Sequence, residues 1–301
     1  MNLLALLLAL VVERGLTHLL HLREPRWLDG YFDWASHRLG GRHGPVAQVA
    51  AAVAILLPVL PVAVASWLLG AHLLGLPQLA FAVFVLLFSF GPRDLRDEVD
   101  DYVAALERRD AEAAARCARG LLESDAAGRG AGLRDAVEEA IFVQANNRVF
   151  GVLFWFVALG PAGAWAFRVS DLMRRRAVFE ANRQGLPAGR DTFSGALVSL
   201  HGLVAWIPAR LAAGAYALAG SFEDAVGNWR VAVDEVSERL LERTEDLLAR
   251  VGKGSLQPSL ADIPGDDLDA ATARGAWRIV VRAIWIWLAL IAVLVLMGSA
   301  A

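Results

Sequence analysis

Long uncharged apolar segments alternate along this chain with segments crowded with Arg, Asp and Glu. The most unusual apolar segment, residues 149–167, reads VFGVLFWFVALGPAGAWAF. As a helix it would be about 28 Å long, which approaches the roughly 30 Å hydrocarbon core of a bilayer. Its centre, Gly160-Pro161-Ala162-Gly163, is unfavourable in an unbroken helix. The pattern therefore predicts a membrane-embedded segment that is broken near its middle.

Further apolar segments predict more membrane helices. Residues 46–69 form a spanning candidate, and Pro58 and Pro61 are expected to kink it. Residues 73–90 form the next candidate, joined to the first by a tight turn. Residues 279–298 form the last, with Trp285 and Trp287 near its start, where interfacial tryptophans are common. The opening segment, residues 2–12, is apolar but short, and we interpret it as part of a membrane-associated helix that continues through residues 16–22.

The polar segments are helical by their periodicity. Residues 93–124 place Leu95, Val99 and Val103 on one face of a predicted helical hairpin, with Asp110 capping its second helix. A stripe of Ala113, Cys117 and Leu121 is expected on that second helix. Residues 133–147 form another helix, residues 229–251 a single amphipathic helix, and residues 253–269 a mobile connector. Because no segment alternates with period two, we expect no sheet and an all-α fold.

This pattern predicts six regions. They are an N-terminal membrane-associated helix with a cytosolic loop (1–44), a transmembrane hairpin (45–91), a cytosolic helical hairpin (92–148), a membrane-embedded core (149–222), a cytosolic amphipathic helix with a linker (223–278) and a C-terminal transmembrane helix (279–301).

The distribution of arginines predicts the orientation in the membrane. Residues 13–44 and 91–148 are rich in arginine, whereas residues 70–77 and the tail after Gly298 have none, so the first two are expected in the cytoplasm. If residues 149–167 crossed the membrane completely, Arg168 and Arg174–Arg176 would lie outside, against this rule. Either the segment turns back as a re-entrant hairpin, which we favour, or it crosses and residues 196–220 return.

Composition limits the possible functions. The chain has 301 residues, a mean hydropathy of +0.45 and a net charge of −3, so no basic field would attract nucleic acid. Its single cysteine, Cys117, excludes an intramolecular disulfide and a cysteine-based zinc site, and we expect it to be buried. His18, His21, His37 and His43 have no suitably spaced carboxylates, so we predict no metal ion, and no motif predicts another cofactor.

Polar residues around the Gly-Pro segment form the candidate site. Ionisable groups at membrane depth are costly, so they usually form ion pairs or face a polar cavity. We predict a cytosol-facing site for a polar or anionic ligand, with three arginines as donors; the alternative is that these residues only anchor and cap helices. No catalytic residue is predicted. The candidate residues are Asn146, Asn147, Arg148, Arg168, Asp171, His201, Trp206 and Arg210.

Two blocks carry a resemblance to a known family. ANNRVFGVLFWFVALGPAGAWAFR, residues 145–168, and LHGLVAWIPARLAAGAYALAGSF, residues 200–222, resemble the most distinctive blocks of the AmpE family, and LALVVERGL, residues 8–16, resembles its opening. The resemblance implies a bacterial inner-membrane protein that modulates β-lactamase induction. It also implies that the protein lies in the lipid bilayer, with possible partner proteins in cell-wall recycling signalling.

AmpE proteins are similar in turn to the cobalamin-pathway synthases called CbiB or CobD. Those enzymes use ATP to join an aminopropanol phosphate to a corrinoid acid, and they share the Gly-Pro-x-Gly and Pro-Ala-Arg-Leu segments. Where they carry acidic residues before Pro-Ala-Arg-Leu, this chain has His201, Gly202 and Ala205. The reaction needs carboxylates to hold Mg²⁺ and ATP. We therefore predict a non-catalytic regulator; a CobD-like amide ligase and a transporter of muropeptides or drugs are the alternatives.

Overall fold

A computed structural model describes residues 26–70, 76–90, 95–122, 131–183, 192–234, 240–257 and 267–299. The predicted N-terminal helix, His18 and His21 lie outside these residues. The chain forms two compact units. Unit 1 comprises Met1–Pro92 and Asn147–Ala205, and unit 2 comprises Arg93–Asn146 and Trp206–Ala301. These units divide the predicted membrane-embedded core, residues 149–222, at Ala205.

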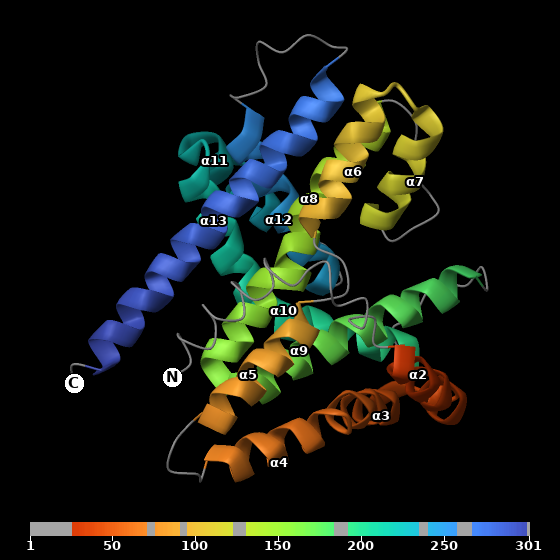
Figure 1. The fold of residues 1–301 in the computed structure, drawn as a ribbon. Helices are drawn as coiled ribbons and strands as arrows, with labels where there is room; N and C mark the ends of the chain where they lie inside the picture. Colours follow the sequence, from red (N-terminus) through yellow and green to blue (C-terminus); the bar gives the residue numbers. More distant parts are fainter. Residues whose placement is uncertain are drawn as a thin grey trace. The chain divides into compact units, whose positions relative to one another are not determined.

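The described residues are helical, with one isolated bridge between His43 and Thr192, so the all-α prediction is confirmed (Figure 1). The elements are α2 (Arg26–Leu39), α3 (Gly44–Leu56), α4 (Val59–Gly70), α5 (Leu76–Ser89), α6 (Leu95–Glu107), α7 (Ala111–Leu122), α8 (Ala131–Ala145), the π-helix η2 (Asn146–Phe150), α9 (Gly151–Arg183), α10 (Phe193–Ala219), α11 (Phe222–Asp234), α12 (Leu240–Leu256) and α13 (Leu268–Ser299).

Pro58 and Pro208 each remove a backbone hydrogen bond from an apolar helical segment, and two tryptophans of α9 donate to carbonyls at these places. α3 and α4 meet at an angle of 44° next to Pro58, which confirms the predicted kink. The indole N–H of Trp165 donates to the Pro58 carbonyl at this break, over 3.1 Å. In α10, Pro208 has no N–H to donate to the Val204 carbonyl, and the Trp155 indole donates to that carbonyl instead, over 3.0 Å. α9 therefore supports the break between α3 and α4 and the turn of α10 that precedes Pro208.

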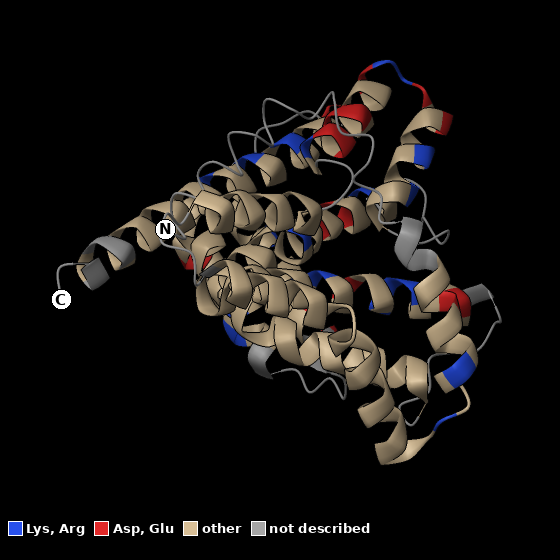
Figure 2. Cartoon of the chain, turned by 60° about the horizontal axis from the view of Figure 1, so that its bottom comes forward, with Lys and Arg blue, Asp and Glu red and all other residues tan. Residues whose placement is uncertain are grey.

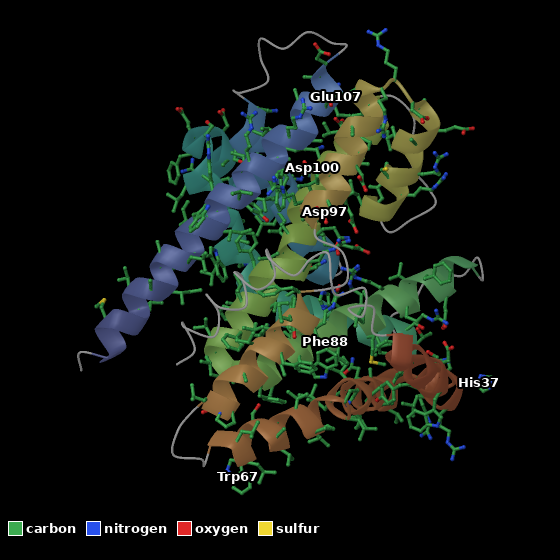
Figure 3. All side chains as sticks on the ribbon, viewed as in Figure 1. His37, Trp67, Phe88, Asp97, Asp100 and Glu107 are labelled. Carbon is green, nitrogen blue, oxygen red and sulfur yellow. The ribbon has the colours of Figure 1, made fainter. Side chains whose placement is uncertain are left out.

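The core of unit 1 lies between α2, α3, α5, α9 and the start of α10. Ala35, Ala51 and Val169 are completely buried there, packed with larger side chains such as Phe32 and Phe193. The opposite face of α3 and α4 is apolar and exposed; Val49 is 65% exposed, and Trp67, labelled in Figure 3, is 77% exposed. An apolar face of this extent is typical of a surface that contacts lipid.

α9 contains a sharp reversal at Gly160, whose φ of 70° and ψ of −157° are accessible essentially only to glycine. In a continuous helix, residues eight apart would lie about 12 Å from each other. Here a Cβ on Gly163 would overlap the Trp155 carbonyl oxygen, and a Cβ on Gly151 would overlap the Phe167 ring. The two arms therefore pack against each other, and α9 forms a helical hairpin (Figure 1). The break predicted at the Gly-Pro-Ala-Gly sequence is confirmed.

Unit 2 begins with the predicted hairpin of α6 and α7. Leu95, Val99 and Val103 are buried on α6, and the Asp110 carboxylate accepts from the Ala113 N–H over 2.9 Å, which confirms the predicted cap. Asp97, Asp100 and Glu107 follow one another along α6 in Figure 3. The buried stripe on α7 is Ala114, Ala118 and Leu121, one residue further along than predicted for its first two members. Cys117 is partly exposed, so the prediction that it is buried was wrong.

The remaining helices of unit 2 correct two further predictions. Residues 229–251 do not form one helix, because the structure has two, α11 and α12, that pack against each other; residues 235–239 lie outside the description. α12 continues to Leu256, so the first part of the predicted connector is helical, since Gly254 packs closely on Asp224 and Ala225 of α11. Its Lys253 pairs with Glu139 of α8 over 2.6 Å.

Three described helical stretches are long and apolar enough to cross a membrane, and the bent pair α3–α4 could form a fourth span. They are Gly132–Ala181, which includes the Gly160 break, Phe193–Ala219 and Leu268–Leu294. α5 has 14 residues, about 21 Å of helix, so the described part of this predicted span is too short to cross alone. In Figure 2 the distal half of α13, which runs towards the C-terminus, contains no charged residue.

Candidate functional site

The candidate site lies at the base of the α9 hairpin, in unit 1. The hairpin has a first arm before Gly160, a second arm after it, and its tip at Gly160. Gly151 of the first arm is opposite Phe167 of the second arm. One helical turn further from the tip, Asn147 of the first (entering) arm and Asp171 of the second (leaving) arm therefore lie at the same level. The tip itself is apolar and exposed, with Leu159 64% exposed. The hairpin therefore separates an apolar tip from a base where polar residues gather.

Asp171 is the centre of a buried ion cluster. Its side chain is completely buried, accepts hydrogen bonds from Arg168 and Arg174 of its own helix, and forms an ion pair with Arg175. Oδ2 lies 3.2 Å from Arg168 Nη1 and 2.8 Å from Arg175 Nε, and Oδ1 lies 2.9 Å from Arg174 Nη2. These residues are three or four positions from Asp171, so helical geometry places them on its face. We call these four residues the Asp171 cluster.

His201 of α10 packs against this cluster from the neighbouring helix. The Ser170 hydroxyl donates to the Phe167 carbonyl over 2.7 Å, and its oxygen lies 3.0 Å from His201 Nδ1. The tautomer of His201 decides which of these two groups donates to the other. Nε2 is 3.9 Å from Asp171 Oδ1, too far for a hydrogen bond. The Phe167 ring packs beside the imidazole, with centroids 5.3 Å apart.

Asn146, Asn147 and Arg148 all lie in the π-helix η2 and are buried, with exposures of 0%, 2% and 7%. π-turns are rare and often occur at functional sites. Through the hairpin register, Asn147 and Arg148 reach the level of the Asp171 cluster from the opposite arm. The role of Arg148 and Arg168 as ligand contacts stays a prediction.

Trp206 and Arg210 belong to unit 2 and form a separate pair. The Arg210 guanidinium lies 4.0 Å from the centroid of the Trp206 ring and donates to the Trp206 carbonyl over 3.1 Å. Trp206 is 40% exposed, with Ile207 and Leu211 exposed beside it. A cation stacked on tryptophan within an exposed apolar face is typical of a side chain at a membrane–water interface.

Ser170, Arg174 and Arg175 were not predicted as site residues. The two arginines were used only to predict the orientation in the membrane. The signal was present in the spacing, because Arg168, Arg174 and Arg175 lie at i−3, i+3 and i+4 from Asp171. The role of Ser170 depends on α10, and no spacing within α9 could have revealed it.

Positively charged side chains gather in this site. Three guanidinium groups surround one carboxylate, and Asp171 is the one buried carboxylate among the described residues of unit 1. Clustered arginines are a common means of binding anions. Guanidinium groups bind carboxylates and phosphates through paired hydrogen bonds. In the part of the chain that the structure describes, no group of three or more His, Cys, Asp or Glu could hold a metal ion.

An all-helical chain with long apolar helices and exposed apolar faces is an integral membrane protein of the helical class. Comparison with known families narrows this: the model of the regulatory signalling modulator protein AmpE matches residues 1–299. The chain belongs to the AmpE family.

Two curated relatives of this chain are described as cobalamin biosynthesis proteins. A cobalamin biosynthesis protein CobD of Stutzerimonas stutzeri is 29% identical over 204 residues, which cover 67% of this chain and 62% of that protein. A CobD of Chromobacterium violaceum is 26% identical over 273 residues, 83% of this chain and 81% of the relative. The match therefore spans about six tenths of the first relative's length. No solved structure matches the chain.

Proposed function

We propose that this chain is a bacterial inner-membrane regulator of β-lactamase induction that responds to an anionic ligand bound at the Asp171 cluster, on the cytosolic side. The observation that carries the proposal is that three arginine side chains gather around one buried carboxylate at the base of the hairpin. Membership of a family described as regulatory signalling modulators supports the regulatory part. Ligand binding, rather than catalysis, is the proposed event.

The composition of the cluster supports a binding role over a purely structural one. Three guanidinium groups in one place offer many N–H donors in the geometry that carboxylates and phosphates accept. Arg174 and Arg175 are the outermost members; their side chains are 9% and 21% exposed, compared with 3% for Arg168. A ligand would therefore approach along Arg175.

The residues have distinct proposed roles. Arg168, Arg174 and Arg175 contact the anion, and Asp171 orients them. Arg148 and Asn147 contribute from the entering arm of the hairpin, and Asn146 shapes the π-turn that carries them. Arg210 and Trp206, which the sequence suggested as a donor and a stacking wall, remain a separate proposal for the interfacial part of α10.

A genetic experiment tests the regulatory role. In a host with an inducible chromosomal β-lactamase, the gene for this chain is deleted and restored on a plasmid, and β-lactamase activity is measured with and without an inducing antibiotic. We expect deletion to change the induction ratio and the wild-type plasmid to restore it. The triple variant R168Q/R174Q/R175Q should fail to restore the ratio. An unchanged ratio after deletion would contradict the proposed function.

Arg176 supplies the matched control. It lies next to the cluster on α9 but pairs with Asp33 over 2.6 Å and with Glu180 over 3.2 Å, and its side chain is 37% exposed. R176Q should restore induction like the wild type. Immunoblots of membrane fractions must show equal amounts of each variant, so that a lost response is not a lost protein.

The CobD relatives favour a second candidate, a ligase of the cobalamin pathway. Complementation tests it directly: a strain that lacks its CobD-type synthase receives this gene and is grown without added cobinamide. We expect no growth, because this chain lacks the acidic residues that the synthases carry before Pro-Ala-Arg-Leu. Growth would favour the ligase over the regulator.

A further inference from the structure

One face of α13 combines positive charge with an exposed apolar surface. Arg278 and Arg282 are both exposed and lie about one helical turn apart. Trp285, 64% exposed, follows on the same face, which continues through the exposed Ala289 and Val293. The opposite face of the helix packs against α6, α8 and α12. We call these five residues, from Arg278 to Val293, the α13 stripe.

The contact between α13 and the end of α10 shows where the stripe meets the membrane surface. α10 and α13 are both candidate membrane spans, and α10 ends at Ala219. The Arg282 side chain donates to the Ala219 carbonyl over 3.4 Å, and a Cβ on Gly220 would meet the Ile279 side chain. After Arg282, α13 has no charged residue up to Ser299. Two apolar helices therefore reach the membrane surface at the same level, beside Arg282.

The two arginines of the stripe have donors available for a ligand. A guanidinium group has five N–H donors, and the Ala219 carbonyl, which holds Arg282 in place, uses one of them. Among the residues that the structure describes, no carboxylate pairs with Arg278 or Arg282. Arg274, one turn earlier on α13, differs because it pairs with Glu107. Exposed guanidinium groups at this level are suited to bind the phosphate group of a lipid.

We propose that the α13 stripe binds an anionic phospholipid. Its phosphate group contacts Arg278 and Arg282, and one acyl chain lies along Trp285, Ala289 and Val293. Charge favours a lipid with a net negative charge over a zwitterionic one, since no carboxylate of the described chain offsets the two arginines. The tryptophan lies between the charged and apolar parts of the stripe, at the depth that its amphipathic ring prefers. This lipid site lies in unit 2 and goes beyond the function proposed for the Asp171 cluster.

Quenching by brominated lipids measures which lipid occupies the stripe. In a Cys117→Ser background, Val293→Cys carries a bimane label, because Val293 is 51% exposed. The full chain is reconstituted into vesicles in which either the phosphatidylglycerol or the phosphatidylcholine is brominated. Bromine quenches the label on contact, so the two series give the relative affinity of the two lipids. Leu60→Cys is the matched control, since Leu60 is 56% exposed on α4, a helix without charged residues.

We expect phosphatidylglycerol to be preferred about twentyfold at Val293→Cys, because each basic side chain near an anionic surface strengthens binding about fivefold. At Leu60→Cys the two lipids should quench about equally. Equal quenching at Val293→Cys, or the same preference at both positions, would overturn the proposal. Protection of Val293→Cys from both lipids would also overturn it, because a protein surface, such as that of a second copy, would then cover the stripe.

Variants assign the preference to the two arginines. R278Q should lower the preference to about fivefold, and R278Q/R282Q should abolish it, whereas R278K/R282K should retain most of it. R274Q is the control next to the site and should change nothing. Quenching by brominated phosphatidylcholine alone must be unchanged in every variant, which shows that α13 still lies in lipid. A preference that survives R278Q/R282Q would contradict the proposed site.

The lipid experiment and the genetic experiment can fail separately. R168Q/R174Q/R175Q should leave the lipid preference at Val293→Cys unchanged, since the Asp171 cluster lies in the other unit. If β-lactamase induction does not depend on this chain but the preference is present, the lipid site stands and the regulatory role fails. If induction depends on the chain and the preference is absent, the lipid site fails alone.

Discussion

α13 and α9 are both long, apolar helices of a membrane protein, yet they are built for different tasks. α13 runs without a break for 32 residues, carries no charge from Ala283 to Ser299, and exposes Trp285 and Leu294 by 64% and 56%. α9 reverses at Gly160 and buries Asp171 among three arginines. The first is suited to contact lipid, and the second to build a polar site.

The difference shows that apolar composition alone does not determine what a membrane segment does. In an unbroken helix such as α13, the backbone groups away from the two ends bond within the helix, and apolar side chains can face lipid. In α9, Gly160 allows the reversal, and Gly151 and Gly163 allow the arms to approach. The reversal in turn brings the polar residues of both arms to the same level of the hairpin.

The largest expected difference between α9 and α13 is in their membrane topology. In a Cys117→Ser background, Glu139→Cys and Glu180→Cys flank the α9 hairpin, and Asp267→Cys and Met297→Cys flank the membrane part of α13. If α9 is re-entrant, both of its positions label from the cytoplasmic side, whereas the two α13 positions label from opposite sides. The measurement is labelling of intact cells with a membrane-impermeant maleimide.

Both outcomes of this labelling are informative. Labelling of Glu180→Cys from the periplasm would discard the re-entrant interpretation and require α10 to return the chain. Labelling of both α13 positions from one side would show that α13 does not cross, and the contrast between the helices would disappear.

Removing the central carboxylate should have the next largest effect. D171N removes the buried carboxylate with which three guanidinium groups pair, which costs about 3–5 kcal/mol. The same substitution at Asp33, an exposed partner of Arg176, should cost less than about 1 kcal/mol. Unfolding of both variants in the same detergent measures the difference. Equal stability would show that the Asp171 cluster is not held by charge.

The hairpin itself can be loosened through its glycines. G163A places a methyl group against the Trp155 carbonyl, and G151A places one against the Phe167 ring. Such overpacking costs about 1–3 kcal/mol. Gly214 of α10 is the control, because an added Cβ there meets nothing within 4 Å, so G214A should be neutral or slightly stabilising. A neutral G163A would argue against close packing of the two arms.

The smallest effect is expected on α13. Trp285 is 64% exposed in the free protein, so W285A should change the unfolding free energy in detergent by less than about 1 kcal/mol. Its effect should appear instead in membranes, as lower insertion efficiency, because tryptophan prefers the interface. A large loss of stability in detergent would place Trp285 in a protein contact and weaken the contrast with α9.

Much of the fold could be predicted from local pattern. The helices, the kink beside Pro58, the cap at Asp110 and the break at Gly160 depend on residues close together in the chain, and each has a local physical cause. The predictions that were wrong concern where helices begin and end and which of their faces are buried. One expected amphipathic helix is two helices, α11 and α12, because their packing against each other decides where each begins.

By itself the sequence determined that this chain is all-α, that lipid replaces water around several of its helices, and which family it resembles, because hydropathy and glycine or proline positions act locally. The spacing of Arg168, Arg174 and Arg175 around Asp171 is local as well, whereas only the tertiary structure decided that Ser170 and His201 meet beside them. The contact between Ser170 and His201 joins α9 to α10 across 31 residues. Such a contact depends on how two helices pack, which no periodicity within either helix specifies.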